Sequence, residues 1–264
     1  MTTLGRLEAV FARAREQRRP ALIAYVVAGD PDAATTAAVL EALVQAGVDV
    51  VELGIPYGDP LADGPIIAAA AQRALAGGMG MERALALVPK VNAPVILFTY
   101  LNPVVQYGVA RFAQNAAGAG AAGAIVPDAP LEESSGLRDA LRGRGMAMPL
   151  LVAPTTPPER ARTIAAASEG FVYLVSRLGV TGTDKRLDLA AVRAQVVRLR
   201  ALTDRPIAVG FGINQAAQIE AIRDVTDGII IGSALVDAFA GSRGAAAARA
   251  AAAFITPLRA AAVS

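Results

Sequence analysis

Several carboxylates follow one apolar segment of the chain. Glu52 lies near the end of the apolar residues 46–53, and Asp59 and Asp63 follow in a turn-rich stretch that ends at Pro65, with no Lys or Arg among them. The apolar run is typical of a buried parallel strand, where an ionised Glu is costly without partners. Acids placed in this way can serve as general acids or bases, so Glu52 and Asp63 are candidate catalytic residues.

Both acids also have a structural interpretation. Glu52 could cap a neighbouring backbone group or pair with an arginine. Asp63 could belong to the turn that begins a helix at Gly64 and Pro65, because Asp-Gly followed by Pro is a common way to start a helix. The other residues of the chain therefore have to decide between the two interpretations.

The composition excludes most other catalytic machinery. The chain has no His and no Cys, which rules out a Ser-His-Asp triad, a Cys-His pair, the usual zinc sites and a disulfide framework. Lys90, at a polar helix end, and Lys185, in a Gly/Thr-rich loop, do not resemble the desolvated lysines that form Schiff bases. We therefore expect carboxylates, hydroxyls and backbone amides to carry the chemistry, with no metal site.

Hydropathy and charge bear on where the protein works. The hydrophobic fraction is 54%, but the uncharged stretch at residues 91–110 contains Asn, Pro, Gln and Gly and would make a poor membrane-spanning helix. Arg6 and Glu8 stand where a signal peptide has its apolar core, so we expect a cytoplasmic protein. The net charge is +2 and the densest basic cluster lies at residues 13–19, so we expect no binding to nucleic acid.

Short apolar runs typical of strands alternate along the chain with longer helical patterns, after a first helix at residues 4–17. These are the elements that must position the two acids. Alternation with short connections implies parallel strands, and eight repeats predict a single-domain (β/α)8 TIM barrel over residues 1–264 with an extra N-terminal helix. A doubly wound open sheet is the rival, but no GxGxxG motif opens the first helix after a strand. The expected strands are 21–27, 48–53, 95–100, 124–126, 147–152, 171–176, 207–210 and 228–231. The expected later helices are 32–45, 66–75 with 81–88, 109–117, 131–142, 158–167, 189–202, 215–222, 233–239 and 245–261, the last interrupted near Pro257.

A barrel of this kind carries its site at the C-terminal ends of its strands. The residues just past each strand are therefore candidates. They are Asp30, Glu52, Asp59, Asp63, Tyr100, Asn102, Asp128, Thr155, Tyr173, Ser176, Arg177, the Gly-Phe-Gly of 210–212 and the Gly-Ser of 232–233.

Two glycine turns follow the seventh and eighth expected strands, at residues 209–214 and 231–234. Glycine lets backbone N–H groups approach an anion, and a helix N-terminus adds its partial positive charge. Because such barrels hold phosphate after these two strands, the pair predicts a phosphate site, although Ser233 alone could be a helix N-cap. Residues 178–188 could form a lid that closes over the ligand, with Gly182 as a phosphate contact, or an ordinary surface loop.

Several motifs resemble those of a known family and follow one another in that family's order. The longest is Glu-Leu-Gly-Ile-Pro-Tyr-Gly-Asp-Pro-Leu-Ala-Asp-Gly-Pro at residues 52–65, which turn chemistry alone does not demand. The others are Tyr-Leu-Asn-Pro at 100–103, Val-Pro-Asp-Ala-Pro at 126–130, Tyr-Leu-Val-Ser-Arg-Leu-Gly-Val-Thr-Gly at 173–182, Val-Gly-Phe-Gly-Ile at 209–213 and Ile-Gly-Ser-Ala at 231–234. On these motifs the sequence resembles the tryptophan synthase alpha chain family over nearly its whole length.

The resemblance implies an enzyme that cleaves indole-3-glycerol phosphate to indole and glyceraldehyde 3-phosphate in tryptophan biosynthesis. Glu52 and Asp63 match the family's catalytic acids, and Tyr173 matches a tyrosine of the site. Glu52 can transfer protons if burial raises its pKa, and an ionised Asp63 can accept the indole N–H. Tyr25, Phe98, Tyr100 and Val152 would line the indole pocket. The other substrate-binding candidates are Thr181 and, on the phosphate turns, Gly182, Phe211, Gly212, Gly232 and Ser233.

The resemblance also implies a partner. The family pairs with a beta chain in an alpha-beta-beta-alpha heterotetramer, and the beta chain binds pyridoxal phosphate, receives indole through a tunnel and changes the activity of the alpha chain. Pro56 and Asp59 lie on the matching docking loop, and Asn102 and Pro103 lie on a second loop. This chain itself is expected to bind no pyridoxal phosphate.

The sequence departs from the family pattern at two places. Gly58 stands where serine is usual, and residues 183–184 are Thr-Asp where a basic residue is common, which bears on how the loops meet each other and the beta chain.

Three other functions have to be considered beside this one. A barrel isomerase or indole-glycerol-phosphate synthase would usually rely on a lysine or a Cys/Asp pair at the strand ends, which this chain lacks. The barrel could also act mainly as an activator of a partner enzyme, or as a stand-alone lyase that releases indole.

Overall fold

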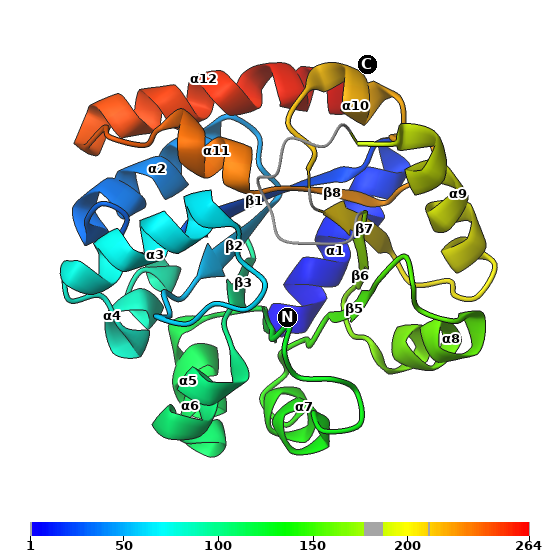
Figure 1. Ribbon diagram of the computed structural model, residues 1–264, viewed down its shortest axis with the longest axis horizontal. Coiled ribbons are helices and arrows are strands. Elements are labelled where there is room, and N and C mark those ends of the chain that lie inside the picture. The colour runs from blue at the N-terminus through cyan, green and yellow to red at the C-terminus, as the bar shows by residue number, and fades with distance from the viewer. Residues whose placement is uncertain (1, 177–186, 211, 264) are drawn as a thin grey trace.

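One sheet of parallel strands forms the centre of the molecule. The computed structural model describes residues 2–176, 187–210 and 212–263, and within them eight strands pair in the order β4-β3-β2-β1-β8-β7-β6-β5. Figure 1 shows the strands around the centre and the helices outside them, except the first helix, Thr3–Glu16, which is seen through the middle. The strands are β1 (Ala21–Val27), β2 (Val50–Gly54), β3 (Val95–Phe98), β4 (Gly123–Ile125), β5 (Leu150–Val152), β6 (Val172–Val175), β7 (Ile207–Gly210) and β8 (Gly228–Ile231).

The two edges of this sheet meet and nearly close it into a barrel. Gly123 at the start of β4 forms a parallel bridge with Ala147, which lies just before β5. The N–H of Ala124 donates to the Ala147 carbonyl at 2.9 Å, and the N–H of Ala147 donates to the Ala122 carbonyl at 2.8 Å. A Cβ at Gly123 would lie 2.4 Å from the Ala147 carbonyl oxygen, so only glycine permits this approach. The predicted (β/α)8 barrel is confirmed, and the open-sheet rival does not apply.

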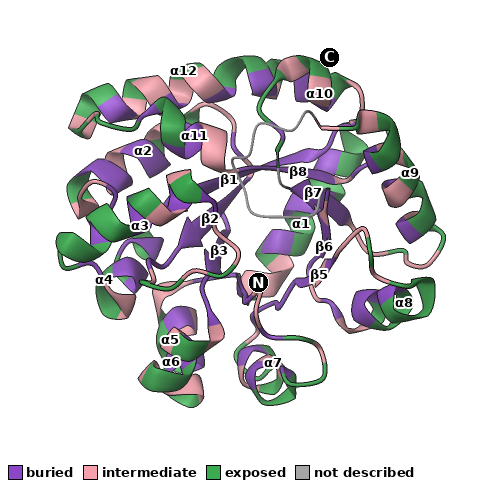
Figure 2. Ribbon diagram, in the orientation of Figure 1, coloured by how far each residue is buried: buried purple, intermediate pink, exposed green. Residues whose placement is uncertain are grey.

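Helices connect the strands and cover them on the outside. In Figure 2 the strands are almost wholly buried, whereas the helices combine buried and exposed residues, as amphipathic helices over a parallel sheet should. The helices are α1 (Thr3–Glu16), α2 (Ala33–Gln45), α3 (Pro65–Ala76), α4 (Met81–Leu85), the 3-10 turn η1 (Val88–Lys90), α5 (Leu101–Tyr107), α6 (Val109–Ala119), α7 (Ser135–Arg142), α8 (Pro158–Ala167), α9 (Leu189–Arg200), α10 (Ala216–Glu220), α11 (Ser233–Ala238) and α12 (Gly244–Val263).

The expected N-terminal helix, α1, packs under the barrel at the end where the strands begin. Its Phe11 ring lies 5.4 Å from that of Phe171, the residue before β6. The N–H of Leu4 donates to the Gly145 carbonyl at 3.0 Å, which ties the start of α1 to the turn that follows α7. Both Leu7 and Phe11 are buried. The helix therefore closes the end of the core that lies opposite the C-terminal ends of the strands.

A short helix, α5, forms where the sequence predicted a loop. Asn102 and Pro103 lie in its first turn and not in an irregular segment. The N–H of Leu101 donates to the Asp128 carboxylate at 2.9 Å, so a residue distant in sequence caps this helix. Pro103 is tolerated because the first-turn N–H groups have no partner within the helix.

Two other elements start three or more residues later than expected. The expected strand 147–152 is regular only from Leu150, since Ala147 makes an isolated bridge. The expected helix 131–142 begins at Ser135, because residues 131–134 form a turn in which Ser134 Oγ donates to the Leu131 carbonyl at 3.1 Å.

The last helix, α12, is continuous, so the expected interruption near Pro257 is wrong. Pro257 has no N–H to donate to the Ala253 carbonyl, so that carbonyl has no partner within the helix. Both residues are exposed, so water can hydrogen-bond to the carbonyl. By length and composition alone α12 could cross a membrane, at a mean hydropathy of 1.2. One of its faces instead packs on α2 and α10, and Figure 1 shows it lying along the outside of the barrel.

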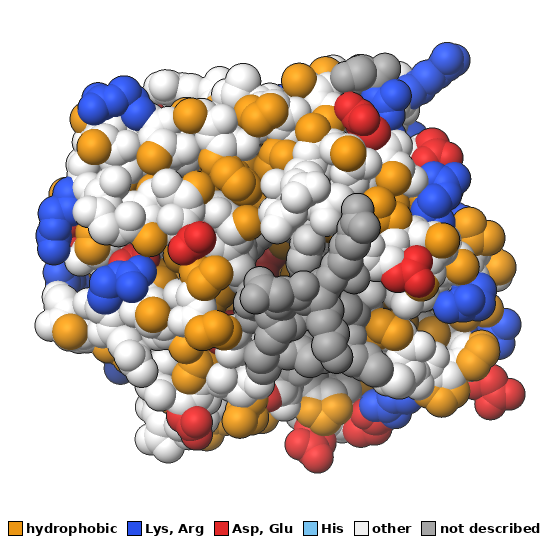
Figure 3. Space-filling view, turned by 45° about the horizontal axis from the view of Figure 1, so that its top comes forward, with side chains coloured by type: hydrophobic (Ala, Val, Ile, Leu, Met, Phe, Trp, Pro, Cys, Tyr) orange, Lys and Arg blue, Asp and Glu red, His pale blue; other side chains and the backbone are white. Residues whose placement is uncertain are grey.

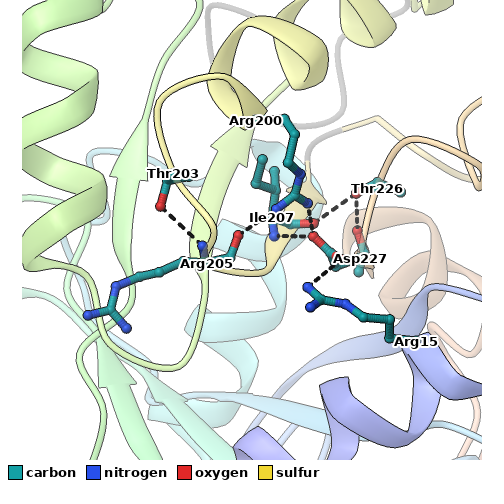
Figure 4. A network of polar contacts seen from close by, with 8 residues as sticks. Arg15, Arg200, Thr203, Arg205, Ile207, Thr226 and Asp227 are labelled. Carbon is teal, nitrogen blue, oxygen red and sulfur yellow. Dashed lines mark hydrogen bonds and ion pairs between the residues drawn. The ribbon is translucent and has the colours of Figure 1, made fainter.

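A polar network holds the end of the barrel where the strands begin (Figure 4). Asp227, just before β8, accepts hydrogen bonds from Arg15 of α1 at 3.3 Å and from Arg200 of α9. Its carboxylate also accepts from the Ile207 N–H at 2.8 Å, and the Thr226 hydroxyl donates to the Ile207 carbonyl at 2.9 Å. One side chain thus joins α1, α9 and the start of β7.

Replacement of Asp227 by Ala should lower the free energy of unfolding by about 2 kcal/mol. The Ile207 N–H would lose its acceptor inside the protein, whereas the partly exposed arginines would regain water. Urea unfolding followed by circular dichroism measures the difference. The exposed Asp204 offers a matched control, and Asp204→Ala should change the free energy by less than about 0.5 kcal/mol. Wild-type stability of Asp227→Ala would contradict this account of the network.

Candidate active site

Glu52 lies on β2, inside the barrel. The strand register sets it beside Tyr25 of β1 and Ile96 of β3, and residues in register on parallel strands project from the same face of a sheet. Its neighbours Val51 and Leu53 project to the opposite face, towards the helices. Glu52 is 1% exposed. The apolar run therefore forms the strand that the sequence predicted and carries one acid into the interior.

No described residue neutralises the Glu52 carboxyl group. None of the ion pairs in the described part of the chain includes it, and its Oε2 has no hydrogen-bond partner there. Burial raises the pKa of Glu52 to about 8, and the negative charge of Asp63 adds to the rise. The structural alternative of an arginine partner for Glu52 thus finds no support in the described residues.

Asp63 lies at the end of the irregular segment 55–64, immediately before the N-cap of α3. That cap is Gly64, and no side chain caps the helix, so Asp63 does not serve as the cap. Asp63 is half-buried and lies near the Tyr100 hydroxyl. Burial raises the pKa of Asp63 to about 6, and the nearby Tyr100 hydroxyl opposes the rise. The two acids therefore sit in different surroundings.

Aromatic side chains from neighbouring strands gather beside these acids. The rings of Tyr25 and Phe98 lie edge to face at 5.6 Å, and those of Phe98 and Tyr100 at 6.2 Å. Burial raises the pKa of Tyr25, and the charges of Asp63 and Glu52 raise it further. The structure thus brings three of the four residues predicted for the indole pocket together with the two acids. The fourth, Val152, is buried at the end of β5.

Tyr173 reaches the same group of residues from β6. It is 4% exposed, and burial, followed by the charge of Glu52, raises the pKa of its hydroxyl. A Cβ at Gly210 on β7 would lie 2.4 Å from the Tyr173 Oη, and one at Gly54 would lie 2.3 Å from the Tyr25 Oη. Gly54 was not among the residues predicted to matter, although a glycine inside a strand often marks such a close approach.

The two glycine turns predicted to hold phosphate follow β7 and β8. Gly212 has a φ of +91°, a conformation that favours glycine. Gly232 is the N-cap of α11 and Ser233 is its first residue, so Ser233 is not the cap. A Cβ at Gly232 would lie 3.8 Å from the Tyr25 Cβ, which places this turn beside the aromatic residues. Thr181, Gly182, Phe211 and the centre of the predicted lid lie outside the described residues.

The two segments predicted to dock a partner meet at the surface. The exposed Asn102 donates a hydrogen bond from Nδ2 to the Tyr57 Oη at 2.9 Å. Asp59 is exposed, Pro56 is buried within the chain and Pro103 is half-buried. Tyr57 was not predicted from the sequence, because its contact depends on a residue in a different connection between strand and helix.

Large apolar side chains are exposed on the same two segments. Leu61 is 71% exposed and Val105, one turn after Asn102 on α5, is 54% exposed. Single exposed apolar residues are ordinary, but two on adjoining segments fit a surface that another protein covers.

The remaining surface features concern charge, metal ligands and depressions. In the view of Figure 3, Lys and Arg side chains lie mainly at the periphery of the face. Within residues 2–176, 187–210 and 212–263, no group of three His, Cys, Asp or Glu side chains could hold a metal ion. A shallow depression of about 270 Å³ contains none of the predicted site residues. Its lining is Glu82, Leu85, Ala86, Pro89, Tyr107, Asn115 and Ala119.

Comparison with known sequences identifies relatives over most of the chain. The family model described as tryptophan synthase alpha chain matches residues 11–262. The tryptophan synthase alpha chain of Synechocystis sp. is 48% identical over 238 residues, which cover 88% of this chain and 90% of that relative. The alpha chain of Prochlorococcus marinus is 50% identical over 231 residues, which cover 86% of this chain and 84% of that relative.

Comparison with solved structures agrees with the sequences. A chain of tryptophan synthase from Mycobacterium tuberculosis superposes with a TM-score of 0.90 at 37% identity, covering 98% of each chain. The tryptophan synthase alpha chain of Legionella pneumophila superposes with a TM-score of 0.86 at 31% identity, covering 99% of this chain and 97% of that chain. From the family match, the identities and the shared fold, we conclude that this chain belongs to the tryptophan synthase alpha chain family.

Proposed function

We propose that this chain is an alpha subunit of tryptophan synthase and cleaves indole-3-glycerol phosphate to indole and glyceraldehyde 3-phosphate by a retro-aldol reaction. Family membership supports the reaction. The observation that carries the assignment to residues is the pair of carboxyl groups, those of Glu52 and Asp63, held in different surroundings beside buried aromatic rings.

Glu52 is proposed as the group that transfers protons. A pKa of about 8 keeps its carboxyl group protonated near neutral pH, so it can protonate the indole ring carbon that carries the side chain. The resulting carboxylate accepts the proton of the neighbouring hydroxyl as the carbon–carbon bond breaks and the aldehyde forms. The electron pair of that bond returns to the indole ring, so indole leaves neutral and Glu52 is again protonated.

Asp63 is proposed as the group that stabilises positive charge on the substrate. With a pKa of about 6 its carboxylate is mostly ionised near neutral pH, and it can accept the indole N–H while charge develops at that nitrogen. Two acids whose surroundings separate their pKa values can take opposite roles at one pH. Tyr173 is proposed to assist the two acids by forming the part of the active-site wall that lies next to Glu52.

The other site residues are proposed to bind the two ends of the substrate. The ring stack of Tyr25, Phe98 and Tyr100, with Val152, would hold the indole. The turns at Gly212 and at Gly232 and Ser233 would hold the phosphate through backbone N–H groups. Thr181, Gly182 and Phe211, outside the described residues, are proposed to complete this set.

A beta chain that carries pyridoxal phosphate is the proposed partner, in an alpha-beta-beta-alpha heterotetramer that passes indole between its chains. The surface at Tyr57, Asp59, Leu61, Asn102 and Val105 is the proposed docking face, because it joins two segments and exposes apolar side chains. Part of this face lies on the segment that bears Asp63, which fits a partner that changes the activity of this chain. Pyridoxal phosphate is proposed to belong to the partner alone.

The same reasoning supports a protein of one domain that works in the cytoplasm. All described strands belong to one sheet. The helix α12 packs along α2, which fits a structural part of the barrel better than a membrane span. We propose no contact with nucleic acid.

Indole release by the purified chain, alone and with a tryptophan synthase beta chain, tests the proposed function. Weak activity that rises with the beta chain supports an alpha subunit. Equal activity in both conditions would indicate a stand-alone lyase. Absence of release by the chain, together with a faster beta-chain reaction, would indicate an activator.

The variant Glu52→Gln should abolish cleavage and leave substrate binding nearly intact. The amide keeps the size of the side chain but cannot give or take the proton. Indole release measures the first effect and calorimetric titration with indole-3-glycerol phosphate measures the second. Glu133→Gln, at an exposed position, is the matched control and should retain wild-type turnover. Normal turnover in Glu52→Gln would disprove its proton-transfer role.

The dependence of kcat/KM on pH should be bell-shaped. Activity should rise as pH passes about 6, because Asp63 must be ionised, and fall as pH passes about 8, because Glu52 must hold its proton. Steady-state rates of indole release across this range provide the measurement. A profile that increases steadily to pH 9 would contradict a protonated Glu52 as the acid.

The variant Val105→Glu should weaken binding of the beta chain at least about tenfold, because it places a charge in an apolar interface. Val197 on α9 is similarly exposed, at 57% against 54%, and lies away from the proposed docking face. Val197→Glu is therefore the matched control and should bind normally. Titration of the beta chain, followed by activation of indole release, measures both. Equal effects of the two variants would argue against this docking face.

A further inference from the structure

The side chain of Tyr25 occupies space that exists because Gly54 has no side chain. A Cβ at Gly54, the last residue of β2, would lie 2.3 Å from the Tyr25 Oη, 2.7 Å from its Cζ and 3.0 Å from its Cε2. The backbone of Gly54 has an ordinary strand conformation, so an alanine there is opposed by contact with Tyr25 and not by backbone strain. Alanine at this position and Tyr25 in its observed place therefore exclude each other.

The register of the strands explains this close approach. Tyr25 on β1 lies beside Glu52 on β2, and Gly54 is the next residue of β2 that projects from the same face of the sheet. The Tyr25 side chain thus leans from its own strand towards the C-terminal end of the neighbouring strand.

The same pairing of tyrosine and glycine occurs a second time, between β6 and β7. Tyr173 lies beside Ala208, and Gly210 is the next residue of β7 on that face. A Cβ at Gly210 would lie 2.4 Å from the Tyr173 Oη. Two buried tyrosines of the site thus depend on a glycine at the end of the next strand, which indicates that the missing side chains shape the site.

The backbone around Gly54 is held from both sides. The Gly54 carbonyl accepts from the Ala28 N–H at 2.8 Å, and the Ile55 N–H donates to the Phe98 carbonyl at 2.8 Å. An added side chain would therefore displace the Tyr25 ring more easily than the strand. That ring is 8% exposed and lies edge to face with Phe98 at 5.6 Å. It would have to tilt away from β2 towards the middle of the barrel, where the indole is proposed to bind.

We infer that Gly54 is a specificity-determining residue, which keeps the Tyr25 ring against the wall of the barrel and so sets the room left for the indole ring. The inference rests on the proposed function and adds to it a positioning residue that acts on the substrate through Tyr25. An apolar pocket discriminates by about tenfold or more when its volume changes by one methylene group.

The variant Gly54→Ala should weaken the binding of free indole at least about tenfold, because the displaced ring takes up part of the pocket. The chain has no Trp, so the fluorescence of indole can be followed in a titration without a background from indole groups of the protein. Binding of glycerol 3-phosphate, measured by calorimetry, should be unchanged, because the turns proposed to hold phosphate follow β7 and β8. Gly118→Ala on α6, where a Cβ would have nothing within 4 Å, is the matched control and should bind both probes normally.

A double-mutant cycle tests whether Gly54 acts through Tyr25. Leucine has none of the three atoms that a Cβ at Gly54 would meet. In the Tyr25→Leu background, Gly54→Ala should therefore cost little further affinity for indole. Equal losses in the two backgrounds would overturn the inference. If Gly54→Ala alone does not fold, the double variant should fold, and its failure to fold would overturn the inference as well.

These outcomes are separate from those that test the proposed function. Indole binding by Gly54→Ala as tight as that of the wild type would overturn the inference and leave the proposed reaction standing. A wild-type chain that binds indole and glycerol 3-phosphate but releases no indole from indole-3-glycerol phosphate would contradict the proposed reaction. The double-mutant cycle would still decide the role of Gly54, because indole binding is measured without turnover.

Discussion

The free-energy cost of placing a carboxyl group inside an apolar barrel is the constraint on which this site depends. Glu52 lies on a strand whose other residues are apolar, and the described residues give its Oε2 no hydrogen-bond partner. Under those conditions the carboxyl group holds its proton at a pH where an exposed Glu would have lost it. A single arginine within reach would ionise it and destroy the property. The protonation of Glu52 therefore depends on the exclusion of cations as much as on the apolar residues that bury it.

The second acid shows how one barrel can provide two environments a short distance apart. A strand holds Glu52 rigidly and keeps it dry, whereas a connecting segment holds Asp63 nearer to solvent and within reach of a hydroxyl donor. Glycines complete the arrangement, since the tyrosines around the acids reach their places only because Gly54 and Gly210 have no side chain. The strand thus provides rigidity, the connecting segment provides a more polar environment, and the glycines provide space for the tyrosine side chains.

Residue patterns predicted the barrel well, because its signals are local. The bounds of β1, β7, β8 and α8 agree with the apolar runs and the flanking Gly and Pro residues. Helix α5 escaped prediction because Pro103 resembles a helix breaker and because the residue that caps it, Asp128, is distant in sequence. In the site, strand ends and motifs pointed to Glu52, Asp63 and the aromatic residues. The bonds from the Ala62 N–H to Tyr100 and from Asn102 to Tyr57 join separate connections, so spacing along the chain could not reveal them.

The junction of β4 with β5 gives the barrel a seam. Every other neighbouring pair of strands shares a run of paired residues, whereas these two meet through one bridge, at Gly123 and Ala147. Along this line the chain divides into two halves of four strands each, joined firmly between β1 and β8 and lightly between β4 and β5. Glu52 and Asp63 belong to the first half, and the glycine turns after β7 and β8 belong to the second. A substrate that spans the two acids and the glycine turns would therefore bind across both halves of the barrel and hold them together.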